Sequence, residues 1–561
     1  MQEEQINPIR EALVSVRAEI ARALHVVRTR GPSQIQFWFL ALAVGVASGA
    51  AALFFRLGIG WVQTFFYGSD DLRLATTAER LPWWWVLGVP ILGGLIVGLI
   101  LHRFTPDGRV RSVADVIEGA ALREGRVERR AGLASALASL ITLGMGGSSG
   151  REGPVVHLAA LIATWVNNRI HASGMTGRDL LGCAVAAAVS ASFNAPIAGA
   201  IFALEVVLRH FAVHAFAPIA IASVAGTVIN RLQFGGVTEF HLPMKSALGF
   251  YVELPAFLLL GLVCGLVAVV LMRAVIFADD FGSWVQGQTG MPRYLRPVIA
   301  GAILGALAIP FPQIIGVGYE TTSAALTGRI GLGMAIALAV VKVVAVSVTM
   351  GGRMGGGMFS PSLVVGALTG LAFGLIATSI FPDASGTQTV YALAGMGAVA
   401  AAVLGAPIST TLIVFELTGD WQTGIAVMTA VSLSTAIASR LVERSFFLAL
   451  LERRGIHLAA GPQAYLAETI RLSSILRPMG HPRAADRQAC EELMREGTVL
   501  DERQSLETAL RLFERSGADF IPVTRRARGQ EQPELVGAVF QTDALRAYAR
   551  ALAETAAEEH S

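Results

Sequence analysis

Long stretches without a charged residue constrain this chain more than any other feature of its sequence. A helix needs about 20 apolar residues to cross the hydrocarbon core of a bilayer, and each of these stretches is near or above that length. Only 15% of the 561 residues are charged, against roughly 25% in soluble proteins. The sequence therefore predicts an all-α polytopic membrane protein. The stretches are Gly31–Phe55, Leu81–Leu101, Leu180–Leu204, Leu254–Met272, Pro297–Tyr319, Met354–Pro382, Ala384–Phe415 and Trp421–Ser439.

Several of these stretches are much longer than one span and contain glycine and proline. We therefore expect pairs of helices, some of them broken or re-entrant. A membrane tolerates such irregular backbone only where it is buried in protein or lines a cavity.

Basic residues flank the apolar region at both ends. Because positive residues favour the cytoplasmic side, we expect both termini to be cytoplasmic. Residues 1–30 alternate apolar and charged positions at helical spacing, which predicts an amphipathic helix on the membrane surface. The net charge of +3 is too small to indicate a nucleic-acid partner. The flanking residues are Arg10, Arg17, Arg22, Arg28 and Arg30 before the first span, and Arg440, Arg444, Arg453 and Arg454 after the last.

The stretch Gly144–Pro154 reads GMGGSSGREGP and places Arg151 and Glu152 inside this apolar sequence. Its glycines let the backbone approach another group closely, and Pro154 suits the first turn of a helix. A helix N-terminus attracts anions, and Glu152 is an anion tethered at that place. Two interpretations stay open: an anion site with a resident carboxylate plug, or a glycine-rich packing turn in which Glu152 pairs with Arg151.

Two motifs recur in the same order along the chain. Phe193–Glu205 and Leu404–Glu416 share Ala-Pro-Ile followed by a glutamate nine residues after the proline. Gly150–Pro154 and Gly357–Pro361 share the form GxxxP. This repetition predicts a duplicated membrane domain whose halves bracket a substrate site with helix ends. The symmetric Glu205 and Glu416 are expected to bond backbone amides or cap helix ends.

The segments GREGP, GGMFSP and FNAPIAGAIFALE resemble the signature segments of the CLC family of chloride channels and chloride/proton exchangers. The resemblance runs from about the first span to Gly455 and implies an inverted-repeat helical bundle over residues 31–459, assembled as a homodimer. It also implies that Glu152 is the external gating glutamate. The anion-binding residues that it implies include Gly150, Arg151, Gly153, Gly357, Met358 and Phe359.

Three positions depart from the family pattern. The family's GSGIP signature aligns with Arg111–Asp115, where only Ser112 is retained as a donor to an anion. Val206 stands where the exchangers usually carry an internal, proton-carrying glutamate. Phe447 stands where the family has an inner tyrosine, so the aromatic ring remains and the hydroxyl donor is lost.

We therefore expect a transporter of chloride or a similar small anion, not an enzyme, with no cofactor and no metal site. Because Val206 cannot carry a proton, channel-like passive conduction is preferred. One alternative is a chloride/proton antiporter with a water-mediated proton route. Another is a nucleotide-sensing membrane protein with vestigial transport.

Residues 460–561 have the composition of a soluble segment, so we expect a small α/β cytoplasmic module there. Within it, residues 498–548 read as strand, helix, strand, turn, strand and helix, and resemble one CBS repeat. Asp543 lies at the position of that repeat's ribose-binding aspartate, which implies an adenine nucleotide as a ligand. A dimerisation module that binds no ligand is the preferred interpretation.

Overall fold

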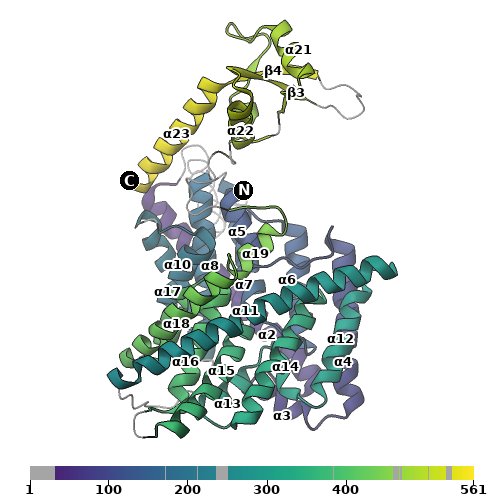
Figure 1. Ribbon diagram of the computed structural model, residues 1–561, viewed down its shortest axis with the longest axis vertical. Coiled ribbons are helices and arrows are strands. Elements are labelled where there is room, and N and C mark those ends of the chain that lie inside the picture. Colours follow the sequence, from purple (N-terminus) through teal and green to yellow (C-terminus); the bar gives the residue numbers. More distant parts are fainter. Residues whose placement is uncertain are drawn as a thin grey trace, which may run out of the picture. The chain divides into compact units, whose positions relative to one another are not determined.

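The computed structural model describes residues 32–170, 172, 174–211, 213–235, 250–382, 385–458, 467, 470–502, 504–525 and 534–560. The predicted amphipathic helix over residues 1–30 lies outside these. The chain divides into two compact units (Figure 1), a helical membrane unit that ends at Ile456 and a tail unit formed mainly by His457–Ser561.

The membrane unit contains seven segments long and apolar enough to cross a membrane, counted over the described residues. The prediction of a multi-pass membrane protein is therefore confirmed. Six are the helices α2 (Gln34–Tyr67), α4 (Trp83–Phe104), α10 (Val213–Phe234), α11 (Phe250–Thr289), α14 (Leu332–Gly351) and α15 (Phe359–Ile380). The seventh segment, Trp421–Glu452, contains α18 (Trp421–Leu441) and α19 (Phe446–Glu452).

Shorter helices connect these segments and fill the space between them. They are α3 (Leu74–Ala78), α5 (Val113–Leu122), α6 (Arg129–Gly144), α7 (Glu152–Ile170), α8 (Gly174–Phe193), α9 (Pro196–Phe202), α12 (Leu295–Ala308), α13 (Tyr319–Leu326), α16 (Gln388–Leu404) and α17 (Pro407–Thr418). A π-helical turn, η1 (Ala203–Leu208), continues α9, and a 3-10 turn, η2 (Pro312–Ile314), precedes α13.

Broken helices occur where the long uncharged stretches predict them, with one exception. Ala384–Phe415 contains the pair α16 and α17, which is interrupted at Gly405 in the left-handed region (φ +70°). Met354–Pro382 contains only one helix, α15. The glycines inside α15 serve close packing instead: a Cβ on Gly370 would lie 2.1 Å from the Tyr391 carbonyl oxygen on α16. Small residues let membrane helices approach in this way without breaking.

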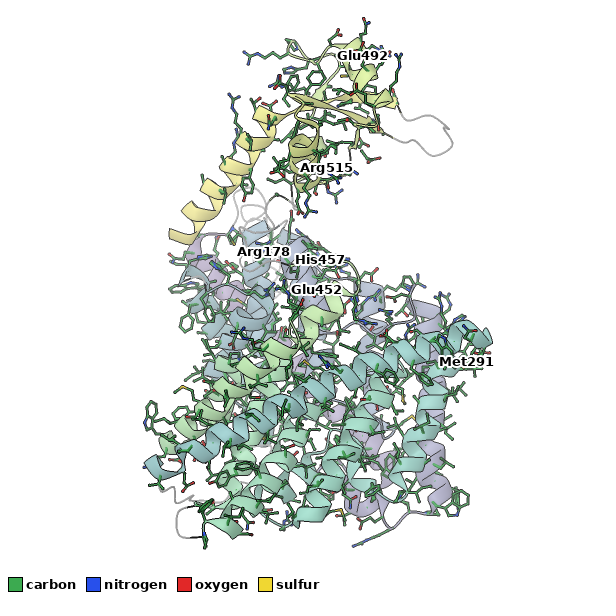
Figure 2. All side chains as sticks on the ribbon, viewed as in Figure 1. Arg178, Met291, Glu452, His457, Glu492 and Arg515 are labelled. Carbon is green, nitrogen blue, oxygen red and sulfur yellow. The ribbon has the colours of Figure 1, made fainter. Side chains whose placement is uncertain are left out.

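Large apolar side chains cover the outside of the membrane unit. On α2, Phe54, Trp61 and Phe65 are each at least 70% exposed. Figure 2 shows the outward-facing side chains along these helices. Such a surface suits lipid rather than water.

The tail unit is a four-stranded sheet with helices packed against it. The strand order is β1-β4-β3-β2, in which β2 pairs parallel with β3 and the other pairs are antiparallel. A separate core that includes Leu506, Phe513 and Val523 holds the sheet and helices together. The predicted order of strands and helices is confirmed. The elements are β1 (Arg477–Pro478), α21 (Arg487–Arg495), β2 (Leu500–Asp501), α22 (Leu506–Ser516), β3 (Phe520–Arg525), β4 (Glu534–Phe540) and α23 (Gln541–His560).

Candidate functional site

The two GxxxP motifs meet in the middle of the membrane unit. The Gly150 N–H donates to the Gly357 carbonyl oxygen at 2.8 Å, and the Gly357 N–H donates back to Gly150 at 2.7 Å. A Cβ on Gly153 would lie 3.2 Å from the Gly357 Cα, so only small residues permit this approach. The bridge brings the N-terminus of α7 beside that of α15.

The Glu152 carboxylate sits on the N-terminus of α15. Its side chain is almost fully buried, at 1% exposure. The Ser360 hydroxyl donates to Oε1 at 2.6 Å, and the Ser360 N–H donates to Oε2 at 3.3 Å. The Tyr319 hydroxyl also donates to Oε1, at 3.3 Å. Glu152 thus accepts hydrogen bonds at a helix N-terminus, which is a place where proteins commonly bind anions.

Arg151 lies beside this arrangement rather than forming its shortest contact. The Arg151 Nε is 4.0 Å from the Glu152 Oε1, the outer limit of an ion pair. The guanidinium stacks over the Tyr319 ring at 4.9 Å, and its Nη2 donates to the Ser192 carbonyl oxygen at 3.3 Å. The contacts therefore favour a carboxylate held by a helix N-terminus over a simple Arg151–Glu152 pair.

The start of α15 is fixed by aromatic packing. Met358 is the N-cap residue, and Phe359 is the first helical residue. The Phe359 ring packs against Phe193 at 4.6 Å and Phe202 at 5.7 Å, which brings the break between α8 and α9 to the same place. The family resemblance implies that the amides of Met358 and Phe359 are anion donors. The amide that bonds Glu152 is that of Ser360.

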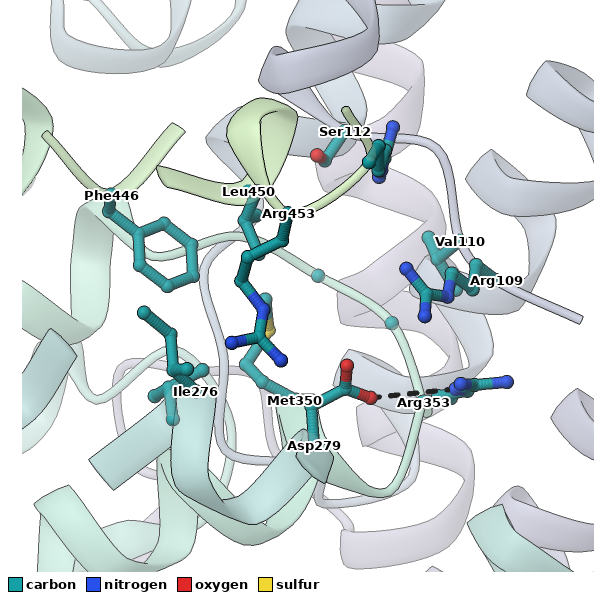
Figure 3. A pocket seen from close by; sticks show the side chains of 14 residues that line it. Arg109, Val110, Ser112, Ile276, Asp279, Met350, Arg353, Phe446, Leu450 and Arg453 are labelled. Carbon is teal, nitrogen blue, oxygen red and sulfur yellow. Dashed lines mark ion pairs between the residues drawn. The ribbon is translucent and has the colours of Figure 1, made fainter. Parts of the chain in front are cut away.

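A cavity of about 100 Å³, here named the basic cavity, lies between α19 and the loops that precede α5 and α15. Ser112, Gly355, Gly356 and Phe446 line it with five charged residues. Figure 3 shows side chains that line the cavity and the ion pair between Asp279 and Arg353, at 3.6 Å. Arg453 pairs with Asp280 and Arg454 with Asp115, so the excess of arginine in the lining is partly neutralised, and the positive potential that remains attracts anions. The charged residues are Arg109, Asp279, Arg353, Arg453 and Arg454.

Ser112 faces this cavity, but its backbone is already engaged. The Ser112 N–H donates to Asp115 Oδ2 at 2.7 Å, and Asp115 Oδ1 pairs with Arg454 at 2.8 Å. A carboxylate of the chain itself therefore satisfies one amide at the start of α5.

Arg111, which replaces a glycine of the family signature, is also neutralised. It pairs with Asp107 at 2.8 Å and with Glu128 at 3.0 Å. Burial of Asp107 favours its neutral form, but the hydrogen bond and charge of Arg111 outweigh burial and hold the pKa of that carboxyl below its usual range. Arg111 thus adds little free positive charge for an anion.

The other two departures are buried positions. Val206 lies in the π-helical turn η1 and is 5% exposed. Phe447 is buried in the first turn of α19, with its ring centroid 6.0 Å from that of Phe446. Of this pair, Phe446 is the residue that lines the basic cavity.

Glu205 and Glu416 each cap a helix in the opposite half of the repeat. Glu205 accepts from the Ile408 and Ser409 amides at the start of α17, at 2.9 and 2.8 Å. Glu416 accepts from the Ile197 and Ala198 amides at the start of α9, at 3.0 and 2.8 Å. The predicted capping role of both glutamates is confirmed.

The sequence did not lead us to predict three residues of the site: Tyr319, Ser360 and Asp115. Ser360 lies within the GMFSP motif, and Ser112 followed by Asp115 has the S-x-x-D spacing of a helix start. Those two signals were available. Tyr319 lies in an ordinary GVGYE segment with no signal of its own.

In the tail unit, Asp543 is engaged within the chain. Its Oδ2 pairs with the Arg477 Nε at 2.6 Å, and the Arg477 guanidinium lies 4.1 Å from the centroid of the Phe540 ring. The position predicted for a ribose contact is thus occupied by an internal ion pair.

Comparison with known proteins places this geometry in a family. The model of the voltage gated chloride channel family matches residues 93–439. A ClcB-like chloride channel protein of Ralstonia nicotianae is 33% identical over 69% of this chain and 90% of its own length. The crystal structure of a slow cyanobacterial Cl⁻/H⁺ antiporter matches with a TM-score of 0.65 and 21% identity, over 74% of this chain and 97% of that one. A CLC-type fluoride/proton antiporter matches with a TM-score of 0.60 and 21% identity, over 73% and 96%. The chain belongs to the CLC family of chloride-transporting membrane proteins.

Proposed function

We propose that this protein conducts chloride, or a similar small anion, through a pathway that the Glu152 carboxylate blocks. The observation that carries the proposal is that the Glu152 carboxylate accepts hydrogen bonds from the N–H and the hydroxyl of Ser360, at the start of α15. A carboxylate and a halide compete for the same donors, so conduction requires Glu152 to leave or to be neutralised.

The experiment is chloride flux from liposomes that contain the purified protein or its Glu152→Gln variant. Neutralising the carboxylate removes charge-assisted hydrogen bonds worth about 1.5–3 kcal/mol each, so flux at neutral pH should rise by about tenfold or more. Glu320→Gln is the matched control, because Glu320 follows Tyr319 but bonds amides of α3 instead of the site. Unchanged flux and an unchanged pH response in Glu152→Gln would reject the plug.

Within that function we propose passive, channel-like conduction. The support is the apolar Val206 at the internal glutamate position and the loss of a hydroxyl at Phe447. Without that hydroxyl, the inner part of the pathway has one donor fewer to hold an anion. The alternative is a chloride/proton antiporter in which water carries the proton. Two proteins of similar fold are described as antiporters, and this supports the alternative.

The remaining features of the proposal concern assembly and the tail. We place both termini in the cytoplasm, the protein as a homodimer with one pathway per subunit, and the tail as an assembly module. The protein acts as a transporter and not as an enzyme. The internal Arg477–Asp543 pair weighs against an adenine nucleotide at the tail, and so against nucleotide sensing as the main function.

A further inference from the structure

A second carboxylate, Asp71, lines a cavity of about 430 Å³ next to Arg151 and Tyr319. We name this space the Asp71 cavity; its charged lining residues are Arg56, Asp70, Asp71 and Arg151. Asp71 belongs to the connection between α2 and α3, outside the membrane-spanning helices. Neither the plug nor the basic cavity uses it.

Hydrogen bonds and close packing hold the Asp71 carboxylate in place. Gln63 Nε2 donates to its Oδ1 at 3.3 Å, and the Val317 N–H also bonds the carboxylate. Gly316, at φ +68°, closes over it: a Cβ there would lie 2.7 Å from Asp71 Oδ1. The segment that leads into Tyr319 is therefore shaped around this carboxylate.

The charged groups facing Asp71 come from two other segments. Arg151 immediately precedes α7, and Lys342 belongs to α14. Lys342 is 2% exposed, and its Nζ donates to the carbonyl oxygens of Ile314 and Gly316 at 3.1 and 3.3 Å. Asp70 is the neighbouring carboxylate on the same loop. Asp71 thus offsets part of the positive charge of Lys342 and of Arg151, and Arg151 lies beside Glu152.

Burial, the largest influence, raises the pKa of the Asp71 carboxyl to about 6, while Arg151, Lys342 and the hydrogen bonds from Val317 and Gln63 act in the opposite direction. Asp71 is therefore ionised above about pH 6 and neutral below it. The change falls within the range that cells and their surroundings reach.

Arg151 connects Asp71 to the plug. Its Nε is 4.0 Å from Glu152 Oε1, and its guanidinium lies over the ring of Tyr319, whose hydroxyl donates to Glu152. When Asp71 is ionised, part of the attraction of Arg151 for an anion is cancelled. When Asp71 takes up a proton, that attraction is restored.

We propose that Asp71 takes up a proton from the Asp71 cavity. Its protonation favours occupancy of the pathway by an anion, and Arg151 transmits this effect. This inference rests on the proposed function, because it assumes that anions pass Glu152. It assigns a second titrating group to the pathway, separate from Glu152 itself.

The test uses Glu152→Gln as the background, which removes the titration of the plug. In planar bilayers, chloride current is measured while the pH on one side is lowered through about 6. A unit charge felt across roughly 10 Å should change the current by about two- to tenfold, with acid increasing it. Only one side of the membrane should respond.

In the same background, Asp71→Asn should keep the current high and remove the pH response. Asp70→Asn is the matched control and should retain it, since Asp70 lines the same cavity. A full pH response in Asp71→Asn would overturn the inference while leaving the proposed function intact. Absence of any chloride current in the folded Glu152→Gln protein would instead reject the proposed function.

A second variant covers the case in which Asp71→Asn does not fold. Gln63→Met removes a donor to the ionised carboxylate, so the pKa of Asp71 and the midpoint of the response should move to higher pH. A midpoint that stays in place would also overturn the inference.

Discussion

Ser360 is the residue whose contacts bear most on how Glu152, the proposed plug, is held. Both its hydroxyl and its N–H donate to Glu152, one to each carboxylate oxygen. Ser362, two residues later, donates its hydroxyl to the Phe359 carbonyl oxygen at 2.6 Å and is not among the donors to Glu152. Variants at the two serines therefore distinguish a hydrogen bond to Glu152 from a hydrogen bond within the helix.

Ser360→Ala should increase chloride flux at neutral pH. The substitution removes one hydrogen bond to a charged group, worth about 1.5–3 kcal/mol, so the equilibrium for release of Glu152 should shift by about tenfold or more. Flux is measured from liposomes at saturating chloride, where weaker anion binding does not limit it. Ser362→Ala should leave flux unchanged. Equal fluxes in the two variants would show that the Ser360 hydroxyl does not hold the plug.

At this scale the sequence indicates the charged residue better than its partners. Glu152 is visible because a carboxylate within apolar helices is rare. Its partners Tyr319 and Ser360 lie 167 and 208 positions away in the sequence; Tyr319 has no signal of its own, and Ser360 is marked only by its place in the GMFSP motif. Only the pairing of Gly150 with Gly357, which the repeat hints at but does not specify, brings them to the carboxylate.

At the scale of elements, the helix ends are held by reciprocal caps. Glu205 from the first half caps α17, and Glu416 from the second half caps α9. Each carboxylate satisfies two amides and faces a positive helix end. The repeat in the sequence is thus a repeat of this contact as well.

Glu205→Gln and Glu416→Gln should therefore destabilise the protein to a similar extent, by about 1–2 kcal/mol each. Thermal unfolding in detergent measures the loss, and Glu443→Gln, at an exposed position, serves as the control. Flux per folded protein should be unchanged in all three variants. If Glu205→Gln alone abolished transport without loss of stability, Glu205 would belong to the pathway.

The uncharged stretches predict most of the membrane-spanning helices but not α10 or α14, and they do not show which of two uses a glycine has. A glycine inside an apolar stretch can break a helix or let a second helix approach, and composition does not distinguish these. Gly405 ends α16, whereas Gly370 continues α15 and packs against the Tyr391 carbonyl oxygen. The choice depends on a neighbouring helix that the local sequence does not contain.

At the scale of the whole molecule, the tail is a unit with its own core. The contacts of Glu152 and the lining of the basic cavity all come from residues up to Arg454. Removing residues 460–561 should therefore leave chloride flux in place while weakening assembly, as judged by flux and size-exclusion chromatography. A truncated protein that elutes as a folded dimer but carries no flux would assign the tail to the transport machinery.

The most direct test of passive conduction through a plugged pathway records chloride and proton movement together. Liposomes containing the protein are given an outward chloride gradient, with a pH indicator inside. Passive conduction predicts chloride efflux that Glu152→Gln increases, with no proton movement against a proton gradient in either protein. Proton movement against its gradient, at a fixed ratio to chloride flux, would rule out passive conduction and establish exchange despite Val206.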